Sequence, residues 1–319
     1  MEIRNMEIHF NISDQDYFNQ DRIGSSDLKS LSSSYWKKWK EPKEFSDDTK
    51  HSFACGKYFH AKLQDLPIET NKILLATVND IKEKLKELKI DFSSTAKKDE
   101  LISLLESQYP DKYSFKKDEC SISDDDIVIL NKAHDLYIKN IGKPNGYMEV
   151  AIFGDLCIDG KSMPIRAKID IMELDRIIDL KTTSNFRQKN DFAKDSFWFI
   201  KNNQYYGQFA LYMILISSLK ESLKYGSVKI FGDEEHHKFL DQFKNIDHHF
   251  EFHVVNLGAK SNRFELPEIY KIHIKNQDSE FYHDGMDIIK NAFINYDRWK
   301  SNIDIGIDMK EDVLYEIEL

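Results

Sequence analysis

The stretch that most constrains the fold is KIDIMELDRIIDLKTT, residues 168–183. Two Ile-rich runs flank a turn signal at Leu174-Asp175, and this pattern predicts a β-hairpin. With the turn at that point, Asp170 lies directly opposite Asp179. Because side chains alternate along a strand, Asp170, Asp179 and Lys181 are expected on one face of the hairpin. A register shift of one residue would reverse the faces of each strand.

The opposite face of this hairpin is expected to be apolar and to pack on a helix. It carries Ile169, Ile171, Ile178 and Leu180.

The two aspartates of the hairpin need an explanation. Asp is depleted from strands, and like charges placed directly across a strand pair destabilise it. Mg²⁺ would compensate the charge, since it binds carboxylate oxygens and phosphate. Lys181 could then orient or deprotonate a water molecule and stabilise charge in a transition state. The alternative is a solvated face on which the aspartates pair with Lys168 and Lys181.

The composition excludes several classes of protein. The 319 residues are 41% hydrophobic and carry a net charge of −10, which describes a folded chain and argues against non-specific coating of nucleic acid. The three cysteines, Cys55, Cys120 and Cys157, form no CxxC pair, so neither a disulfide framework nor a zinc or Fe–S site is indicated. The N-terminus lacks a signal-peptide core, and the longest apolar run, Ala210 to Ile216, is too short to span a bilayer. We expect a soluble, cytoplasmic protein without membrane contact.

Periodicity divides the chain into helical and extended parts. A Ser-capped helix is expected from about Ser26 in GSSDLKSLSSSYWKKWK, a second helix in FACGKYFHAKLQ, and a third in FWFIKNNQYYGQFALYMILISSLK. Strands are expected in residues 146–183, with a turn at Asp159-Gly160, and then at 226–231, 249–256 and 269–274. A last helix is expected at about 281–300. The predicted class is α/β or α+β.

The hairpin residues belong to a larger set of motifs that resembles a known family. Asp170 followed by Asp179-Leu180-Lys181 resembles the D…(D/E)xK signature of PD-(D/E)xK nucleases, with Ile169 in place of the usual proline. FACGKYFHAKL is similar to the glycine-then-histidine element of RecB-type nucleases, with His60 in the histidine position. GQFALY contains a QxxxY element, Gln208 and Tyr212. The opening ISDQDYFNQDRIGSSDLKSLSSSYWKKWKEP resembles the lead-in of the exonuclease VIII (RecE) nuclease domain, so the resemblance covers about residues 11–215.

The resemblance implies a single domain over residues 1–319, with a restriction-endonuclease-like core in which helices flank a mixed central sheet. It implies Mg²⁺ or Mn²⁺, without an Fe–S cluster, and the following roles. The metal ligands are His60, Asp170, Asp179 and the carbonyl of Leu180; the catalytic lysine is Lys181, with Glu149 as an outer acidic residue; Gln208 and Tyr212 hold DNA or support the lysine; Ser25 and Ser26 contact DNA.

The implied activity is metal-dependent exonuclease digestion of linear duplex DNA from its ends, 5′-to-3′, leaving single-stranded tails. The implied partners are double-stranded DNA ends and a single-strand annealing recombination protein. Related enzymes form homo-oligomeric rings, although no feature of this sequence bears on oligomerisation. The expected source is bacterial or phage-encoded. The alternatives are a RecB-like nuclease of other polarity or single-strand specificity, and a non-catalytic DNA-binding protein of the same fold.

Residues 77–107 form a small helical insertion that resembles a SAP or helix–extended-loop–helix module. Its six Lys against seven Asp and Glu give no basic patch, but Lys97 and Lys98 cluster at the start of the second helix, where they could contact DNA. The alternative is a helical hairpin that packs on the core or on a partner. Two His-rich tracts, EEHH at 234–237 and DHHFEFH at 247–253, are interpreted as structural or solvated rather than metal-binding.

Overall fold

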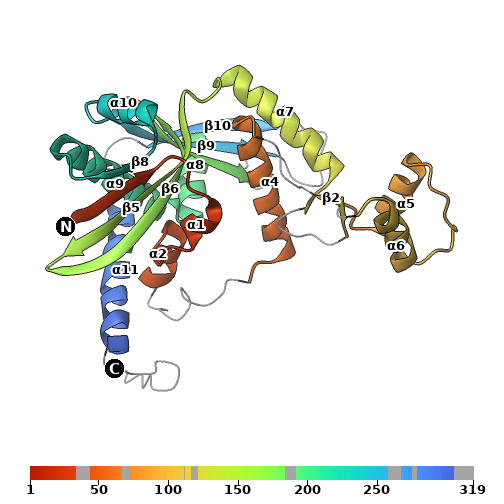
Figure 1. Cartoon of the computed structure of the whole chain (residues 1–319), viewed down its shortest axis with the longest axis horizontal. Coiled ribbons are helices and arrows are strands. Elements are labelled where there is room, and N and C mark those ends of the chain that lie inside the picture. The colour runs from red at the N-terminus through yellow and green to blue at the C-terminus, as the bar shows by residue number, and fades with distance from the viewer. Residues whose placement is uncertain are drawn as a thin grey trace.

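The computed structural model describes residues 1–33, 44–66, 72–110, 112–115, 121–183, 192–257, 267–274 and 279–304. The YWKKWKEP end of the first predicted helix and lead-in, and Cys120, lie outside these residues. Helices flank a seven-stranded mixed sheet with the order β10-β9-β7-β6-β5-β1-β8 (Figure 1). The strands are β1 (Glu2–His9), β5 (Gly146–Ile158), β6 (Lys161–Glu173), β7 (Arg176–Thr183), β8 (Lys229–Phe231), β9 (His249–Asn256) and β10 (Glu268–Ile274).

The two faces of the sheet bury separate cores. On one face the core contains Phe209, Phe250 and Phe252 and is covered by α2 (Ser25–Ser32), α9 (Tyr205–Tyr225) and α11 (Glu280–Asp304). On the other face α4 (Asp47–Leu63) and α7 (Asp124–Asn140) pack over Ile178 and Leu180 of the central strand β7. The remaining helices of this part are α1 (Asp14–Phe18), α8 (Phe192–Asn202) and α10 (Glu234–Phe243).

Both predicted hairpin turns are present. The β5–β6 turn is Asp159-Gly160, with φ of 49° and 78°; two positive φ angles are typical of a type I′ turn. The β6–β7 turn is Leu174-Asp175, and its register pairs Ile171 with Ile178. The two pairs of this ladder, Ile171–Ile178 and Met172–Ile177, have the predicted register, but the ladder ends there and does not include the predicted pair Asp170–Asp179.

The alternation of side chains breaks at one point of the hairpin. Ile171 lies in the core under α4 and α7, whereas Ile169 lies in the core under α9. The prediction that Ile169 shares a face with Ile171 is therefore wrong. The reason lies in the adjacent strand: Glu149, located between the pairs Met148–Ile171 and Val150–Ile169, has a φ of 56° and interrupts the regular pleat.

Two helix predictions also need correction. The N-cap of α2 is Gly24, whose N–H donates to the Asp27 carboxylate at 2.9 Å, so the predicted Ser cap is wrong. The long helix predicted in FWFIKNNQYYGQFALYMILISSLK is two helices, α8 and α9, because Gln204 adopts a left-handed φ of 51° between them. The other predicted elements are present within a few residues of their expected bounds.

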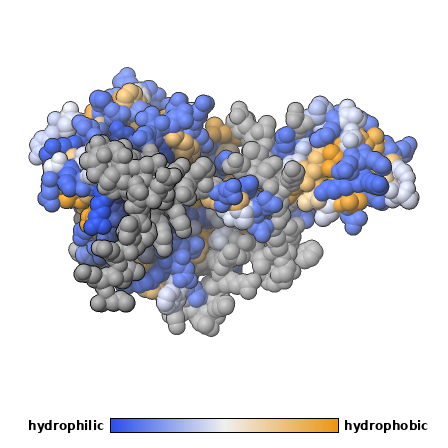
Figure 2. Space-filling model, turned by 90° about the horizontal axis from the view of Figure 1, so that it is seen from below, coloured by the Kyte–Doolittle hydropathy of each residue, from blue (hydrophilic) through white to orange (hydrophobic). Residues whose placement is uncertain are grey.

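The helical insertion has a core of its own. Ile81 and Leu85 of α5 (Val78–Glu87) pack against Leu101 and Leu105 of α6 (Lys98–Gln108). Three short strands lie at its base, β2 (Lys72–Leu74), β3 (Tyr113–Ser114) and β4 (Ser121–Ile122), in the order β3-β2-β4. The module projects to one side of the main sheet (Figure 1), and Figure 2 shows hydrophobic side chains among hydrophilic ones at its surface.

None of the helices in the part of the chain described above is both long and apolar enough to cross a membrane.

Candidate active site

Three ligand-type side chains from three separate elements converge where Glu149 interrupts the regular pleat of β5. One ligand atom each from His60 on α4, Glu149 on β5 and Asp170 on β6 lies within 4.8 Å of the other two. His60 Nδ1 lies 3.0 Å from Glu149 Oε1. One imidazole and two carboxylates make a donor set that suits a divalent cation.

A glycine brings α4 close enough to the sheet for His60 to take part. A Cβ at Gly56 would lie 3.3 Å from Thr182 Oγ1 of β7, which is tighter than most carbon contacts. Gly56 precedes His60 by four residues, so both lie on the same side of α4. The glycine-then-histidine spacing in the sequence therefore has a direct structural cause.

The backbone of Glu149 is strained. A positive φ at a non-glycine residue costs about 1–2 kcal/mol, and here it occurs inside a 13-residue strand. This conformation accompanies a carboxylate that contacts both His60 and Lys168, the latter at 2.9 Å. Burial would raise the pKa of Glu149, but the bond to His60 and the charge of Lys168 outweigh burial and lower the pKa to about 2. Glu149 is thus ionised throughout the physiological range.

Asp170 and His60, both partly exposed, lie close together, and each shifts the pKa of the other. Burial, followed by repulsion from Asp179, raises the pKa of Asp170 to about 7. Burial alone would lower the pKa of His60, but the charges of Asp170 and Glu149 outweigh it, so that pKa is raised as well. Asp170 Oδ2 also accepts a hydrogen bond of 2.7 Å from the N–H of Leu180. Asp170 therefore binds a proton more readily than an ordinary aspartate does.

Asp179 and Lys181 form a buried ion pair next to this cluster. The side chain of Asp179 is 0% exposed and pairs through Oδ2 with the Lys181 ammonium. Burial would lower the pKa of Lys181, but attraction to Asp179 and Asp170 outweighs burial and raises it. The ammonium also lies 4.9 Å from the centre of the Tyr205 ring, a distance suited to a cation–π contact. Lys181 is therefore positively charged at neutral pH.

Gln208 and Tyr212 support this pair from α9. Gln208 Nε2 donates to Asp179 Oδ1 at 2.5 Å and to the Tyr212 hydroxyl at 2.9 Å. The Tyr212 hydroxyl in turn donates to the carbonyl of Lys168 at 2.7 Å. Tyr212 is only 3% exposed, so its hydroxyl is buried under the site and does not lie at the surface. Of the two roles expected for these residues, the geometry favours support of the lysine.

Lys168 is a site residue that the motif comparison did not single out. Its ammonium bridges Glu149 at 2.9 Å and Asp14 of α1 at 2.5 Å. The sequence contained a signal for it, because Lys168 precedes Asp170 by two residues and the alternation predicts a shared face. The expected pairing was with an aspartate of the hairpin, whereas the observed partners come from β5 and α1.

Other predicted residues lie away from this cluster. Ser25 and Ser26 occupy the first turn of α2, where Ser26 is exposed. Lys97 is the exposed N-cap of α6, and the ammonium of Lys98 donates to the carbonyl of Ala76 at 2.7 Å. The backbone N–H of Leu180, whose carbonyl was expected as a metal ligand, donates to Asp170 Oδ2.

The His-rich tracts take part in buried or capping contacts. In EEHH, the ring of His236 accepts the N–H of Asp233 at the start of α10. In DHHFEFH, Glu251 is 0% exposed and its Oε2 lies 2.7 Å from His253 Nε2. Tyr137 bonds the other ring nitrogen of His253 at 2.7 Å. His236 and His253 therefore both have bonding partners within the protein.

The residues present fit a divalent cation. His60, Glu149 and Asp170 supply one nitrogen and carboxylate oxygens within a small space, which is a donor set that a divalent cation binds. Asp179, expected as a ligand, lies next to this group and is held by Lys181 and Gln208.

A mixed sheet that places the Asp and Lys of a D…DxK motif beside a His–Glu–Asp group defines a protein of the PD-(D/E)xK class. The family described as "PDDEXK-like domain of unknown function (DUF3799)" matches residues 24–230, which is more than half of the chain, and the chain belongs to this family. The matched residues include every member of the site from His60 to Tyr212. No curated protein matches the sequence. The predicted superfamily and the helix-flanked mixed sheet are thereby confirmed, and the class indicates a nuclease-type function.

Proposed function

We propose that this protein is a Mg²⁺- or Mn²⁺-dependent DNA exonuclease that hydrolyses phosphodiester bonds from the ends of linear duplex DNA. The observation that supports this proposal is the convergence of His60, Glu149 and Asp170 beside the buried Asp179–Lys181 pair. Digestion runs 5′-to-3′ and leaves single-stranded tails, the substrate of a single-strand annealing recombination protein.

His60, Glu149 and Asp170 hold the cation. When bound, a divalent cation would polarise the oxygens of a phosphate and lower the pKa of a water molecule bound to it. Glu149 is ionised and kept in place by Lys168, so it needs no proton release to bind. Asp170 and His60 must lose any proton they carry, since both have raised pKa values.

Lys181 acts as a fixed positive charge. An ammonium with a raised pKa is a poor general base at neutral pH, so of the roles expected for it the geometry favours stabilising the charge that develops on the phosphate. Asp179 forms an ion pair with this ammonium, and Gln208 donates a hydrogen bond to Asp179. The chain Tyr212–Gln208–Asp179–Lys181 thus fixes the position of one cationic group.

Digestion of end-labelled linear duplex DNA with Mg²⁺ tests the proposal, with closed circular duplex and Lys181→Ala as controls. We expect label release from the 5′ end only, no cleavage of the circle, and no release by the variant. Cleavage of the circle would replace exonuclease by endonuclease activity. DNA binding without cleavage under Mg²⁺ or Mn²⁺ would favour the non-catalytic alternative.

A further inference from the structure

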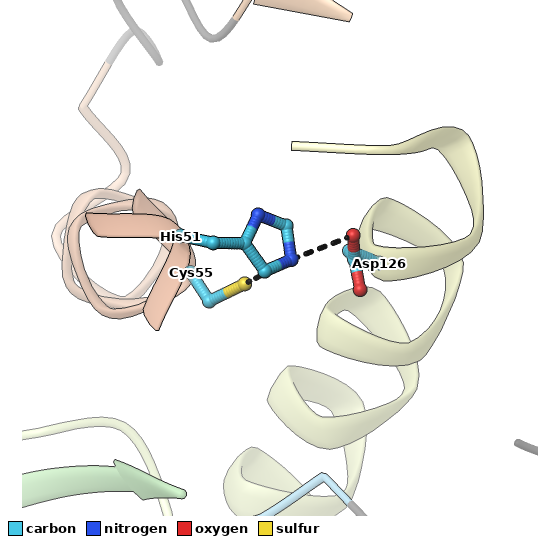
Figure 3. Close-up of side chains that lie close together, drawn as sticks. All are labelled: His51, Cys55 and Asp126. Atoms are coloured by element: carbon cyan, nitrogen blue, oxygen red, sulfur yellow. Dashed lines mark hydrogen bonds and ion pairs between the residues drawn. The ribbon is translucent and has the colours of Figure 1, made fainter. Parts of the chain in front are cut away.

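A second group of ligand-type side chains lies on α4, in the half of the helix that precedes His60. His51 and Cys55 occupy positions i and i+4 and therefore share one face, and Asp126 approaches them from the first turn of α7 (Figure 3). His51 Nε2 lies 3.1 Å from Asp126 Oδ2 and 3.9 Å from Cys55 Sγ. All three ligand atoms lie within 4.8 Å of one another.

The geometry does not suit a nucleophilic cysteine. In a Cys–His–Asp relay, the thiol and the carboxylate bond different nitrogens of the imidazole. Here both contacts are made by the same nitrogen, Nε2 (Figure 3). A nitrogen that donates to Asp126 has no lone pair with which to accept the proton of Cys55.

The same geometry suits a metal ion of the zinc class. Ligand–metal distances of about 2.0–2.3 Å in a tetrahedral site place the ligand atoms about 3.3–3.6 Å apart, close to the two distances observed. Sulfur and imidazole nitrogen bind Zn²⁺ more strongly than they bind Mg²⁺. A thiolate, a carboxylate and a neutral imidazole also balance the two positive charges, so the bound ion would add no net charge to a poorly solvated site; His51 is 7% and Cys55 5% exposed.

The carboxylate of this group is already oriented. Asp126 accepts the N–H of Ser123 at 3.1 Å in the capping box of α7, and it also bonds the Ser123 hydroxyl. Ser123 directly follows β4, one of the three strands at the base of the helical insertion. An ion at this position would join α4 to α7 where the insertion leaves the core.

A third cluster, His249–Glu251–His273, is a weaker candidate among the described residues. The Lys271 ammonium lies 3.1 Å from Glu251 Oε2 and the Arg176 guanidinium lies 3.9 Å from the same oxygen. These cations already compensate the carboxylate and would repel a metal ion. Among the described residues, the ion pair of Asp126 is with His51, and no Lys or Arg pairs with it.

We propose that His51, Cys55 and Asp126 form a zinc-type metal site, distinct from the candidate active site, with water in the fourth position. The ion pins the N-terminal half of α4 to the first turn of α7.

Co²⁺ is the probe, because thiolate-bound Co²⁺ absorbs in the near ultraviolet and tetrahedral Co²⁺ gives strong visible bands. The full-length protein is freed of metal by dialysis against a chelator and titrated with Co²⁺, followed by Zn²⁺. We expect the thiolate band to saturate at one equivalent, to disappear when Zn²⁺ displaces Co²⁺, and to persist in Asp170→Asn. It is expected to be lost in Cys55→Ser and retained in the matched control Cys157→Ser, which alters the other described cysteine.

A folded wild-type protein without a thiolate band would overturn the proposal and leave a hydrogen-bonded clip between two helices. A band that survives Cys55→Ser would also overturn it. Should Cys55→Ser fail to fold, as judged by circular dichroism, Asp126→Asn provides the second variant. Its apparent affinity for Co²⁺, measured from the thiolate band, should be at least about tenfold lower than that of the wild type. An unchanged affinity would contradict the site.

Discussion

His60 of α4 and Glu149 of β5 meet across the candidate site at 3.0 Å, although 89 residues separate them in the chain. Their contact joins a helix to a strand position where the backbone is strained, since Glu149 has a positive φ. Glu149 contacts Lys168 at the same time, so the carboxylate links α4, β5 and β6. Several consequences of this arrangement are measurable.

The strain at Glu149 predicts an unusual order of stability between two substitutions. At a positive φ, glycine is favoured over alanine by about 1 kcal/mol or more, so Glu149→Gly should be more stable than Glu149→Ala. Both variants lose the same contacts to His60 and Lys168, and the comparison therefore isolates the backbone. Thermal or denaturant unfolding of the two proteins measures the difference.

Asp155, in the same strand, provides the matched control. Its φ is not among the positive values, and glycine in a regular strand is destabilising relative to alanine by about 0.5–1 kcal/mol. Asp155→Gly should therefore be less stable than Asp155→Ala, the reverse order. If the alanine variant were the more stable one at both positions, Glu149 would not be strained.

Metal affinity should increase with pH. The pKa of Asp170 is raised to about 7 by burial and by Asp179, so below pH 7 a proton occupies a group that the cation needs. Each displaced proton makes the apparent affinity fall by up to about tenfold per pH unit, and the dependence levels off once both Asp170 and His60, whose pKa is also raised, have lost their protons. Calorimetric titration with Mn²⁺ between pH 6 and 8 measures this slope. An affinity that is constant over this range would contradict the assigned ligand.

Removing the charge of Lys181 should impair both turnover and stability strongly. Loss of a preorganised charge at the reacting phosphate typically lowers turnover by about 10²–10³-fold. Asp179 would lose its buried partner, which costs about 3–5 kcal/mol when one member of a buried ion pair is removed. Lys181→Ala is compared with Lys161→Ala, which breaks the exposed pair with Asp297 and should change neither quantity appreciably. Full activity in Lys181→Ala would remove this residue from the mechanism.

Gln208 should act on turnover through Asp179. Gln208→Ala leaves Asp179 Oδ1 without its donor, at a cost of about 1–3 kcal/mol, and frees the Asp179–Lys181 pair to move. We expect turnover to fall about 10–100-fold, as for other partners that orient functional groups, while the KM for DNA changes little. Gln242→Ala, on the exposed side of α10, is the control. A raised KM with normal turnover would instead indicate a direct contact with DNA.

Much of this arrangement could be predicted because local rules fix it. The Asp159-Gly160 turn, the register at Ile171–Ile178 and the strand at 249–256 follow from turn chemistry and from alternating or apolar runs. The motif spacing also indicated His60, Asp170, Asp179 and Lys181, which the fold brings together.

The remainder depends on contacts between distant segments. A regular pleat was assumed for residues 146–173, and nothing in the local sequence marks Glu149 as the residue that interrupts it. Likewise, helical periodicity continues through Gln204, so its left-handed backbone was not predicted. The partners of Lys168 come from α1 and β5, and Asp126 reaches His51 and Cys55 only because α7 packs on α4.

The two lysines that begin the second helix of the insertion should behave differently. The Lys98 ammonium donates to the carbonyl of Ala76 and is partly buried, whereas Lys97 is exposed at the N-cap of α6. If the insertion binds DNA through this end, Lys97→Ala should weaken binding uniformly across sequences and reduce the salt slope by about one. Lys98→Ala should mainly lower the unfolding temperature, because it removes a contact that joins α6 to Ala76, the residue before the N-cap of α5. Binding isotherms at several salt concentrations distinguish the two effects, and an unchanged slope in Lys97→Ala would leave the insertion as a packing module.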